Sequence, residues 1–357
     1  MHYSESVQTE SNPPNIQHCE NSNKLTDSAP ERKIIKSDTC FELWGKTDPY
    51  KSLCCHMIDA GCCAKAYLES PALAAVTEYL AKQWNCSAEE AIRFTSYLVA
   101  MHDIGKATPQ FQMQSEEQLN RLKNTEVREI FPDHKLNPVR HEFLSQKIAG
   151  RIWKGWGADK RLYSAYSCVL SLHHQRTDHS ERKKPIVHEE WQHLQDELEK
   201  KIRGVFPVPE ALPKAGNMDP VCMLLTGILI LCDWVASSGP FDVLPDWSDQ
   251  YEKKSSETAR KAMKQYGLTE DHRMKGITSF QSMWPEISSP RNIQNKMEEL
   301  DVLAPLTIIE APMGEGKTEA ALYFAEKAAE ASDKRGVYVS LPTLCHESRN
   351  GTAPVPG

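Results

Sequence analysis

An adjacent histidine and aspartate, His102 and Asp103, stand at the end of an apolar run that spans residues 94–101. Gly105 then interrupts the helical pattern, and Lys106 follows it. Neighbouring residues of a helix project about 100° apart, so these two side chains cannot stack, but both can reach an ion at the helix end. A carboxylate can bridge two ions while an imidazole binds one of them. Ordinary polar residues at a helix end would give the same pattern, so the pair needs partners elsewhere.

Other histidines and carboxylates border or lie within apolar helical runs in the same way. Together with the first pair, they are His56, His102, Asp103, His141, His173, His174 and Asp233. A lone unpaired polar residue there would cost about 1–3 kcal/mol, and for any one histidine a partner in the core is the simplest explanation. Separate partners for all of them are harder to supply, whereas one shared metal centre satisfies them together. The pattern therefore predicts a metal centre.

Helical periodicity predicts the elements that would position these residues. Residues 53–68 read as a helix that carries His56, Asp59 and Cys63 along one face. Further helices are expected at residues 70–83, 87–101, 140–153, 162–172, 189–203, 221–238 and 250–266. Because every large element in this part is a helix, the first folded domain, which begins near Phe41, is expected to be all-α.

Composition and charge limit the class of protein. The net charge of -7 argues against a wholly basic protein that coats nucleic acid, although a local basic groove stays possible. The 11 cysteines and the lack of an N-terminal apolar signal fit reduced thiols in a cytoplasmic protein. The pairs at 54/55 and 62/63 favour buried thiols over a zinc knuckle. The longest apolar run, 221–232, is shorter than the roughly 20 residues of a membrane span. It reads as a buried helix that ends at Asp233, and no membrane partner is expected.

A second motif whose residues could bind a ligand lies near residue 315. A short β-prone run at 306–310 leads into a glycine-rich loop and then a helix, which is the Walker A context. The candidate nucleotide-binding residues of this loop are Gly314, Gly316, Lys317 and Thr318. Backbone amides and the helix N-terminus would cradle phosphates, Lys317 would reach the β and γ oxygens, and Thr318 would meet Mg. An ATP/Mg site is therefore predicted.

The order of the metal-centre residues resembles that of the HD metal-dependent phosphohydrolase superfamily. Residues 101–106, 173–174 and 233–237 resemble, in particular, the N-terminal nuclease domain of the CRISPR-associated nuclease–helicase of type I systems. The resemblance covers roughly residues 45–345. One departure is Gln175, which follows the His-His pair where the family often has glycine.

The resemblance implies a centre of two divalent metal ions. One ion would be held by His56, His102, Asp103 and Asp233, and the second by Asp103, His141, His173 and His174. Two ions would generate a hydroxide and stabilise both the attacking and the leaving oxygen of a phosphodiester. The many imidazoles favour Mn, Fe, Co or Ni over Mg. Asp103, as the bridge, and Lys106, which could neutralise phosphate charge, are the expected catalytic residues, and Ser237 is a candidate hydrogen-bond donor to Asp233.

The second motif resembles the start of a superfamily 2 helicase. Ala311 replaces the usual first glycine of the loop, which these helicases tolerate, and Gln294 with Phe280 resembles their adenine-reading Q motif. Residues 336–343 resemble the next strand and motif Ia, which touches the DNA backbone in that family. No Asp-Glu box, second RecA-like domain or arginine finger follows in this sequence. ATP hydrolysis and translocation are therefore not expected, and the chain reads as a truncated or frame-disrupted product.

The predicted fold is an all-α HD-superfamily metal phosphohydrolase domain followed by an incomplete α/β RecA-like (P-loop) domain. Its expected parts are a disordered segment (1–40), the HD nuclease domain (41–245), a helical linker (246–275), the start of RecA-like lobe 1 (276–345) and an irregular tail (346–357).

The favoured function is that of a metal-dependent nuclease for single-stranded DNA in CRISPR interference. The resemblance implies recruitment by an RNA-guided type I surveillance complex that has opened an R-loop, and a missing helicase portion is a further possible partner. One alternative is an HD-type nucleotide phosphohydrolase, against which the attached Walker loop and Lys-rich segment argue. Another is a non-catalytic remnant that at most binds nucleotide or a surveillance partner.

Overall fold

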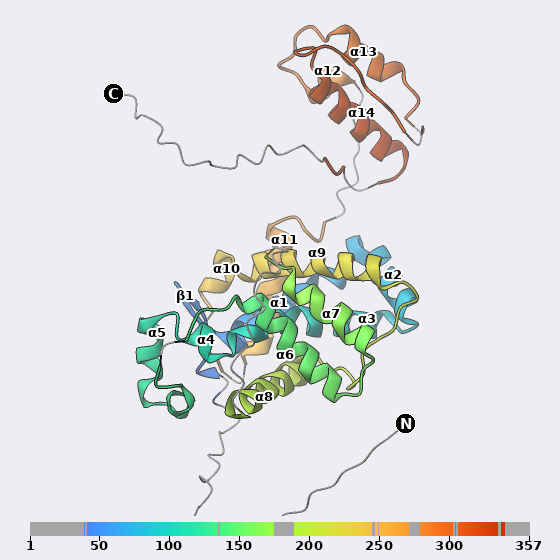
Figure 1. Cartoon of the computed structure of the whole chain (residues 1–357). Coiled ribbons are helices and arrows are strands. Elements are labelled where there is room, and N and C mark those ends of the chain that lie inside the picture. The colour runs from blue at the N-terminus through green and yellow to red at the C-terminus, as the bar shows by residue number, and fades with distance from the viewer. Residues whose placement is uncertain are drawn as a thin grey trace, which may run out of the picture.

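The computed structural model describes residue 39 and residues 41–339, except residues 135, 175–188, 245, 246, 249, 271–278, 303, 305, 335 and 336. The predicted disorder at 1–40 (residue 39 apart), the turn at Gln175 and the tail at 346–357 lie outside the described residues. Of the strand expected at 336–343, only residues 337–339 are described, and they form no strand. Figure 1 shows the elements in order along the chain.

Helices build the body that holds the predicted metal centre (Figure 1). It opens with an antiparallel hairpin, β1 (Trp44–Thr47) and β2 (Tyr50–Ser52). Its α-helices are α1 (Leu53–Leu68), α2 (Ala74–Trp84), α3 (Ala88–Ala100), α4 (Pro109–Gln112), α5 (Glu116–Arg121), α6 (His141–Gly155), α7 (Lys160–Ser171), α8 (Glu189–Val205), α9 (Met218–Ala236), α10 (Gly239–Asp242) and α11 (Tyr251–Gln265). Its 3-10 helices are η2 (Pro71–Leu73), η3 (Met101–Lys106), η4 (Leu122–Asn124) and η5 (Glu126–Ile130).

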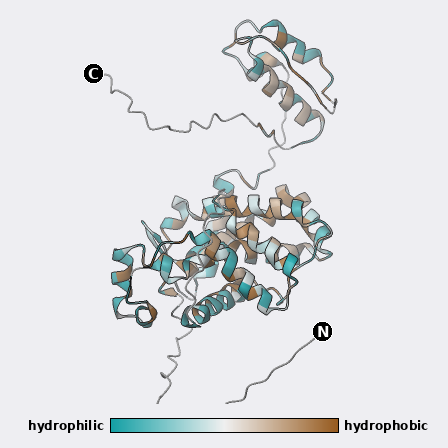
Figure 2. Ribbon diagram, in the orientation of Figure 1, coloured by the Kyte–Doolittle hydropathy of each residue, from teal (hydrophilic) through white to brown (hydrophobic). Residues whose placement is uncertain are grey.

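Helix α1 forms the centre of this body and is buried along almost its whole length. The Ser52 side chain caps its first turn by accepting a hydrogen bond from the backbone N–H of Cys55. Helices α3, α9 and α11 pack around α1 and share one hydrophobic core with it. The cysteines at 54/55 and 62/63 are buried in that core, as the sequence predicted. Figure 2 shows the contrast between the apolar residues of the central helices and the mostly hydrophilic α8.

The predicted helical linker at 246–275 is wrong, because α11 belongs to the helical body. Tyr251 and Met263 of α11 are fully buried in the core that surrounds α1. The Tyr251 hydroxyl donates to both carboxylate oxygens of Asp59 on α1 at 3.0 Å, and the Ser255 hydroxyl donates to Asp59 at 2.7 Å. The lysines that suggested a solvated linker occupy the opposite face of the helix, so α11 closes the domain rather than leaving it.

Helix α9 carries Asp233 and is only partly buried. The prediction of a buried helix holds for Leu225 and Leu229 but fails for Met223 and Trp234, which are 77% and 62% exposed. Within the described part of the chain, α9 is also the one helix long and apolar enough to span a membrane, with 33% of the tested window buried. Length and composition alone do not distinguish such a span from a core helix of a soluble domain.

A smaller unit contains α12 (Phe280–Met283), α13 (Asn292–Glu299) and α14 (Lys317–Ala331). Phe280, Met297, Tyr323 and neighbouring apolar residues form its own hydrophobic core. Phe280 packs edge-on against Tyr323 at 5.5 Å, so it is not available to stack on a base. The β-prone run at 306–310 forms no strand, because no other described segment pairs with it, and a lone strand has no partner for its backbone groups.

The network around Asp59 gives a test of the fold. Lys51 Nζ lies 2.8 Å from Asp59 Oδ2, and the two side chains are only 5% and 0% exposed. Asp59→Ala should therefore cost about 3–5 kcal/mol in the free energy of unfolding, since it leaves a buried ammonium unpaired. Urea denaturation measures this loss. The double variant with Lys51→Met should lose less than the sum of the single variants, whereas strictly additive losses would contradict the ion pair.

Candidate metal centre

The Asp103 carboxylate lies at the centre of the predicted site. Its Oδ2 atom is 3.3 Å from Nε2 of both His56 and His102. Its Oδ1 atom is 3.2 Å from His141 Nε2 and 3.8 Å from His173 Nε2. The two oxygens of one buried carboxylate thus face two different sets of imidazoles, which is the geometry of a bridging ligand.

Two groups of side chains surround this carboxylate, and each could hold an ion. The groups are His56, His102 and Asp233, and His141, His173 and His174. Within each group the candidate ligand atoms lie within 4.8 Å of one another. The structure therefore brings together every side chain that the sequence predicted for the metal centre, from α1, η3, α6, α9 and the end of α7.

Backbone carbonyls orient two of the imidazoles. His102 Nδ1 lies 2.9 Å from the Val99 carbonyl oxygen, and His173 Nδ1 lies 2.6 Å from that of Leu170. Because a carbonyl only accepts hydrogen bonds, Nδ1 must donate in both rings. When the ring is neutral, each Nε2 atom then presents its lone pair to the centre, as metal-ligating histidines require.

Several buried polar atoms of the centre make no hydrogen bond within the described chain. They are His56 Nδ1, His102 Nε2, Asp103 Oδ1 and His173 Nε2. Such atoms cost free energy unless something else satisfies them. Imidazole nitrogens and carboxylate oxygens that point into a shared space are suitable ligands for divalent transition-metal ions. These residues therefore fit the divalent metal ions that the family resemblance implies.

Burial and neighbouring charges shift the pKa values of the side chains in the centre in different directions. Burial disfavours the imidazolium of His102, but Asp103 and Asp233 outweigh burial and raise the pKa of His102 to about 10. Burial also works against the Asp103 carboxylate, but His102 and Lys106 hold its pKa well below the usual range. Burial, reinforced by His102, lowers the pKa of His173 to about 3. The neutral His173 imidazole is thus ready to bind metal, whereas His102 must release a proton to do so.

Lys106 differs from the sequence expectation of a lysine available to the substrate. Its Nζ atom lies 2.7 Å from Asp103 Oδ2 and donates to the Gly45 carbonyl at 3.0 Å. Lys106 therefore holds the central carboxylate and ties η3 to β1. Ser237 lies where the sequence suggested, since its hydroxyl donates to Asp233 Oδ1 at 3.3 Å.

Residues that the sequence reading did not single out hold η3 in place. The buried Gln112 side chain accepts from the Trp44 backbone N–H at 3.1 Å and donates to the Trp44 carbonyl at 2.9 Å. The Ser145 hydroxyl of α6 accepts from the Gly105 backbone N–H at 2.9 Å. Gln112 follows Lys106 by six residues and Ser145 lies one turn after His141, so the available signal was their position relative to these candidate site residues.

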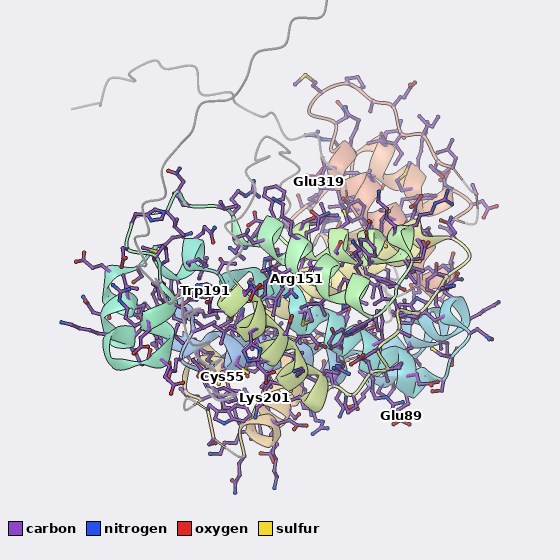
Figure 3. All side chains as sticks on the ribbon, turned by 60° about the horizontal axis from the view of Figure 1, so that its bottom comes forward. Cys55, Glu89, Arg151, Trp191, Lys201 and Glu319 are labelled. Atoms are coloured by element: carbon purple, nitrogen blue, oxygen red, sulfur yellow. The ribbon has the colours of Figure 1, made fainter. Side chains whose placement is uncertain are left out.

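Helix α8 supports η3 from another side. Arg151 of α6 reaches α8 (Figure 3), where its guanidinium donates to Asp196 at 2.7 Å. On the same helix, the buried Gln195 side chain donates to the Ala107 carbonyl, directly after η3, at 2.9 Å. The helix expected at residues 189–203 thus also positions the segment that contains His102 and Asp103.

The phosphate-binding loop has the backbone that its glycines predict. Gly314 and Gly316 adopt φ values of 81° and 73°, in the left-handed region that favours glycine. Lys317 Nζ donates to the carbonyls of Ala311 and Pro312 at 2.5 and 2.7 Å. The lysine therefore lies across its own loop, where the phosphates of a nucleotide would bind.

Gln294 contacts this loop directly. Its amide donates to the Gly316 carbonyl at 3.4 Å and accepts from the Arg291 backbone N–H at 2.8 Å. A cavity of about 480 Å³ beside the loop is lined by residues that include Arg291, Gln294, Gly316, Lys317 and Thr318. The contact of Gln294 with adenine stays a prediction.

A model of the family "Cas3, HD domain" matches residues 44–241, more than half of the chain. The chain belongs to the Cas3 HD-domain family. The match contains every residue of the metal centre. It ends before α11, which the structure nevertheless places in the same core.

Curated relatives and solved structures agree with this assignment. The chain is 29% identical over 339 residues to the CRISPR-associated endonuclease/helicase Cas3 of Thermus thermophilus, covering 89% of this chain and 35% of that protein. It is 26% identical over 282 residues to the CRISPR-associated nuclease/helicase Cas3 of Streptococcus thermophilus, covering 70% of this chain and 30% of that protein. The chain thus spans about a third of the length of these relatives.

Two solved structures show the fold. The Thermus thermophilus cas3 HD domain in the presence of Ni²⁺ matches with a TM-score of 0.51 at 22% identity, covering 65% of this chain and 92% of that one. T. fusca Cas3-ATP matches with a TM-score of 0.53 at 22% identity, covering 85% of this chain and 36% of that one. The predicted fold, an HD domain followed by the start of a helicase domain, is confirmed.

The close approach of η3 to α6 gives a test of the site geometry. A Cβ atom on Gly105 would overlap the His141 carbonyl oxygen and the Ser145 backbone nitrogen. Gly105→Ala should therefore displace the start of α6, cost about 1–3 kcal/mol of stability and weaken metal binding by the group that includes His141. Gly155→Ala, at the other end of α6, meets nothing within 4 Å and serves as the control. Equal thermal stability and metal content in the two variants would contradict the close packing of Gly105 against the start of α6.

The two ligand groups predict the metal content. Protein incubated with Mn²⁺ or Ni²⁺ and gel-filtered should retain two ions per chain by elemental analysis and should melt at a higher temperature than metal-free protein. His141→Ala should retain about one ion, and Asp103→Asn should lose most of both. His193→Ala, on an exposed position of α8, should match the wild type. Metal content unaffected by Asp103→Asn would refute the bridging geometry.

Proposed function

We propose that this chain is a divalent-metal-dependent nuclease that cuts single-stranded DNA in CRISPR interference. The observation that carries the proposal is the buried Asp103 carboxylate, whose two oxygens face separate groups of histidines. A centre for two ions suits hydrolysis of a phosphodiester, because both the attacking and the leaving oxygen need stabilisation. The names of the curated Cas3 relatives, which are nucleases and helicases, support the same substrate class.

In the proposed mechanism, Mn, Fe, Co or Ni ions would supply a hydroxide nucleophile and stabilise the charge on the scissile phosphate. One ion would be held by His56, His102, Asp103 and Asp233, and the other by Asp103, His141, His173 and His174. The protein's own contribution is orientation. The Val99 and Leu170 carbonyls turn two imidazoles inward, and the Ser237 hydroxyl steadies Asp233. Lys106 holds Asp103 ionised, which keeps both carboxylate oxygens able to bind metal.

The proposed substrate is a single DNA strand, and the proposed partner is the complex that displaces this strand from the duplex. An RNA-guided complex that opens an R-loop displaces one strand, which then presents unpaired phosphodiesters. A solved structure titled "CRISPR RNA-guided surveillance complex, pre-nicking" includes a chain that matches this one with a TM-score of 0.52. Recruitment of this chain by such a type I complex, in the cytoplasm, is part of the proposal.

The smaller unit is proposed to bind ATP with Mg. Lys317 and Thr318 would contact the phosphates and the Mg ion, while the glycine-rich backbone cradles the phosphates.

Cleavage of circular single-stranded DNA tests the proposed function. Mn²⁺-loaded protein should cut the circle, and Asp103→Ala should reduce the rate at least about a hundredfold while circular dichroism shows unchanged helicity. Asp219→Ala is the matched control, since Asp219 is an exposed carboxylate at the opposite end of α9 from Asp233. Folded, metal-loaded protein that leaves the circle intact would refute the proposal. Release of phosphate or nucleoside from a nucleotide panel by the same sample would favour a nucleotide phosphohydrolase instead.

A further inference from the structure

Three lysines near the metal centre differ in what neutralises their charge. Lys51 is paired with Asp59 at 2.8 Å, and Lys106 is paired with Asp103 at 2.7 Å. Lys46, on β1, forms no ion pair with any carboxylate in the described part of the chain. Of the three ammonium groups, Lys46 is therefore the one without a carboxylate partner among the described residues.

The backbone places Lys46 at the edge of the centre. Its Nζ atom donates to the carbonyl of Ala236, the last residue of α9, at 3.4 Å, and Asp233 lies one turn earlier on that helix. The preceding residue, Gly45, accepts a hydrogen bond from Lys106. The segment that carries Lys46 is thus tied both to η3 and to the end of α9, the two elements that supply carboxylates to the centre.

The surroundings of Lys46 favour an added anion. Burial lowers the pKa of Lys46; Asp233 and Asp242 oppose this effect, while Lys51 and Lys106 reinforce it. A half-buried ammonium that faces two other cations as well as two carboxylates gains free energy when a further anion approaches it. An ammonium also has three N–H donors, and Lys46 uses one of them in a long hydrogen bond.

We propose that Lys46 binds a phosphate oxygen of the substrate strand beside the metal centre. This inference rests on the proposed nuclease function and names a residue that contacts the phosphodiester. The sequence suggested Lys106 for such a contact, but Asp103 and Gly45 engage that lysine. The Lys46 residue is only partly buried, so its side chain is open to the approach of a phosphate from outside the protein.

The test compares three lysine variants. Lys46→Gln removes the charge but keeps an amide that can donate to Ala236, and Lys46→Arg keeps the charge. Lys253→Gln removes an exposed lysine on α11 as the matched control. Binding of a short fluorescent single-stranded DNA is measured by anisotropy without metal, and cleavage of the same DNA is measured with Mn²⁺. Metal content and melting temperature are recorded for every variant.

Lys46→Gln should weaken metal-free binding about tenfold and raise KM by a similar factor, with a smaller effect on kcat. The slope of log Kd against log salt concentration should fall by about 0.7, as expected for one lost phosphate contact on a single strand. Lys46→Arg should bind within about twofold of the wild type, and Lys253→Gln should match it.

Equal binding by Lys46→Gln and the wild type would overturn the inference. So would a loss of metal or a lower melting temperature that accounts for weaker binding, because Lys46 would then only hold the end of α9. A wild-type protein that binds DNA without cutting it would refute the proposed nuclease function, and the binding comparison would still decide the role of Lys46. A wild-type protein that does not bind DNA would overturn both.

Discussion

A carboxylate that is only 2% exposed, that of Asp103, is the constraint on which this domain is built. Removing a charge from water costs several kcal/mol, and the cost is offset only by well-placed partners. The surrounding helices therefore deliver imidazoles from positions near or just beyond their ends, where the chain can turn the side chain inward. The cost of one buried charge thus explains why α1, α6 and the end of α7 converge on η3. Asp233 of α9 pairs with His56 instead.

The hairpin and α8 make this convergence rigid. Gln112 is fully buried and also donates to the Lys106 carbonyl at 3.0 Å. Its side-chain amide therefore joins the segment 106–112, which follows Asp103, to Trp44 of β1. Gln195 holds the same segment from α8. These contacts involve only neutral amides and backbone groups. They fix the position of the charged residues without adding charges that would compete for metal.

The sequence predicted the helices well, and it selected the side chains that meet around Asp103, because both leave local signals. Apolar residues at helical spacing placed the helix of residues 53–68 at the bounds of α1, and polar residues at apolar helix ends indicated the candidate ligands. Other features depend on contacts between distant residues. Tyr251 of α11 meets Asp59 across 192 positions, so no local pattern could separate a closing helix from a linker. The run at 306–310 has strand propensity, but a strand needs a neighbour, which propensity alone does not supply.

The two halves of the centre differ in their access to water. His56 and His102 are almost completely buried, whereas His174 is exposed and His141 is half-buried. A ligand at the surface can rotate away and let solvent replace it, but an enclosed ligand cannot move without disturbing the core. Ions in the two halves would therefore exchange at different speeds. The half with the exposed His174 would equilibrate with the free metal of the surroundings first.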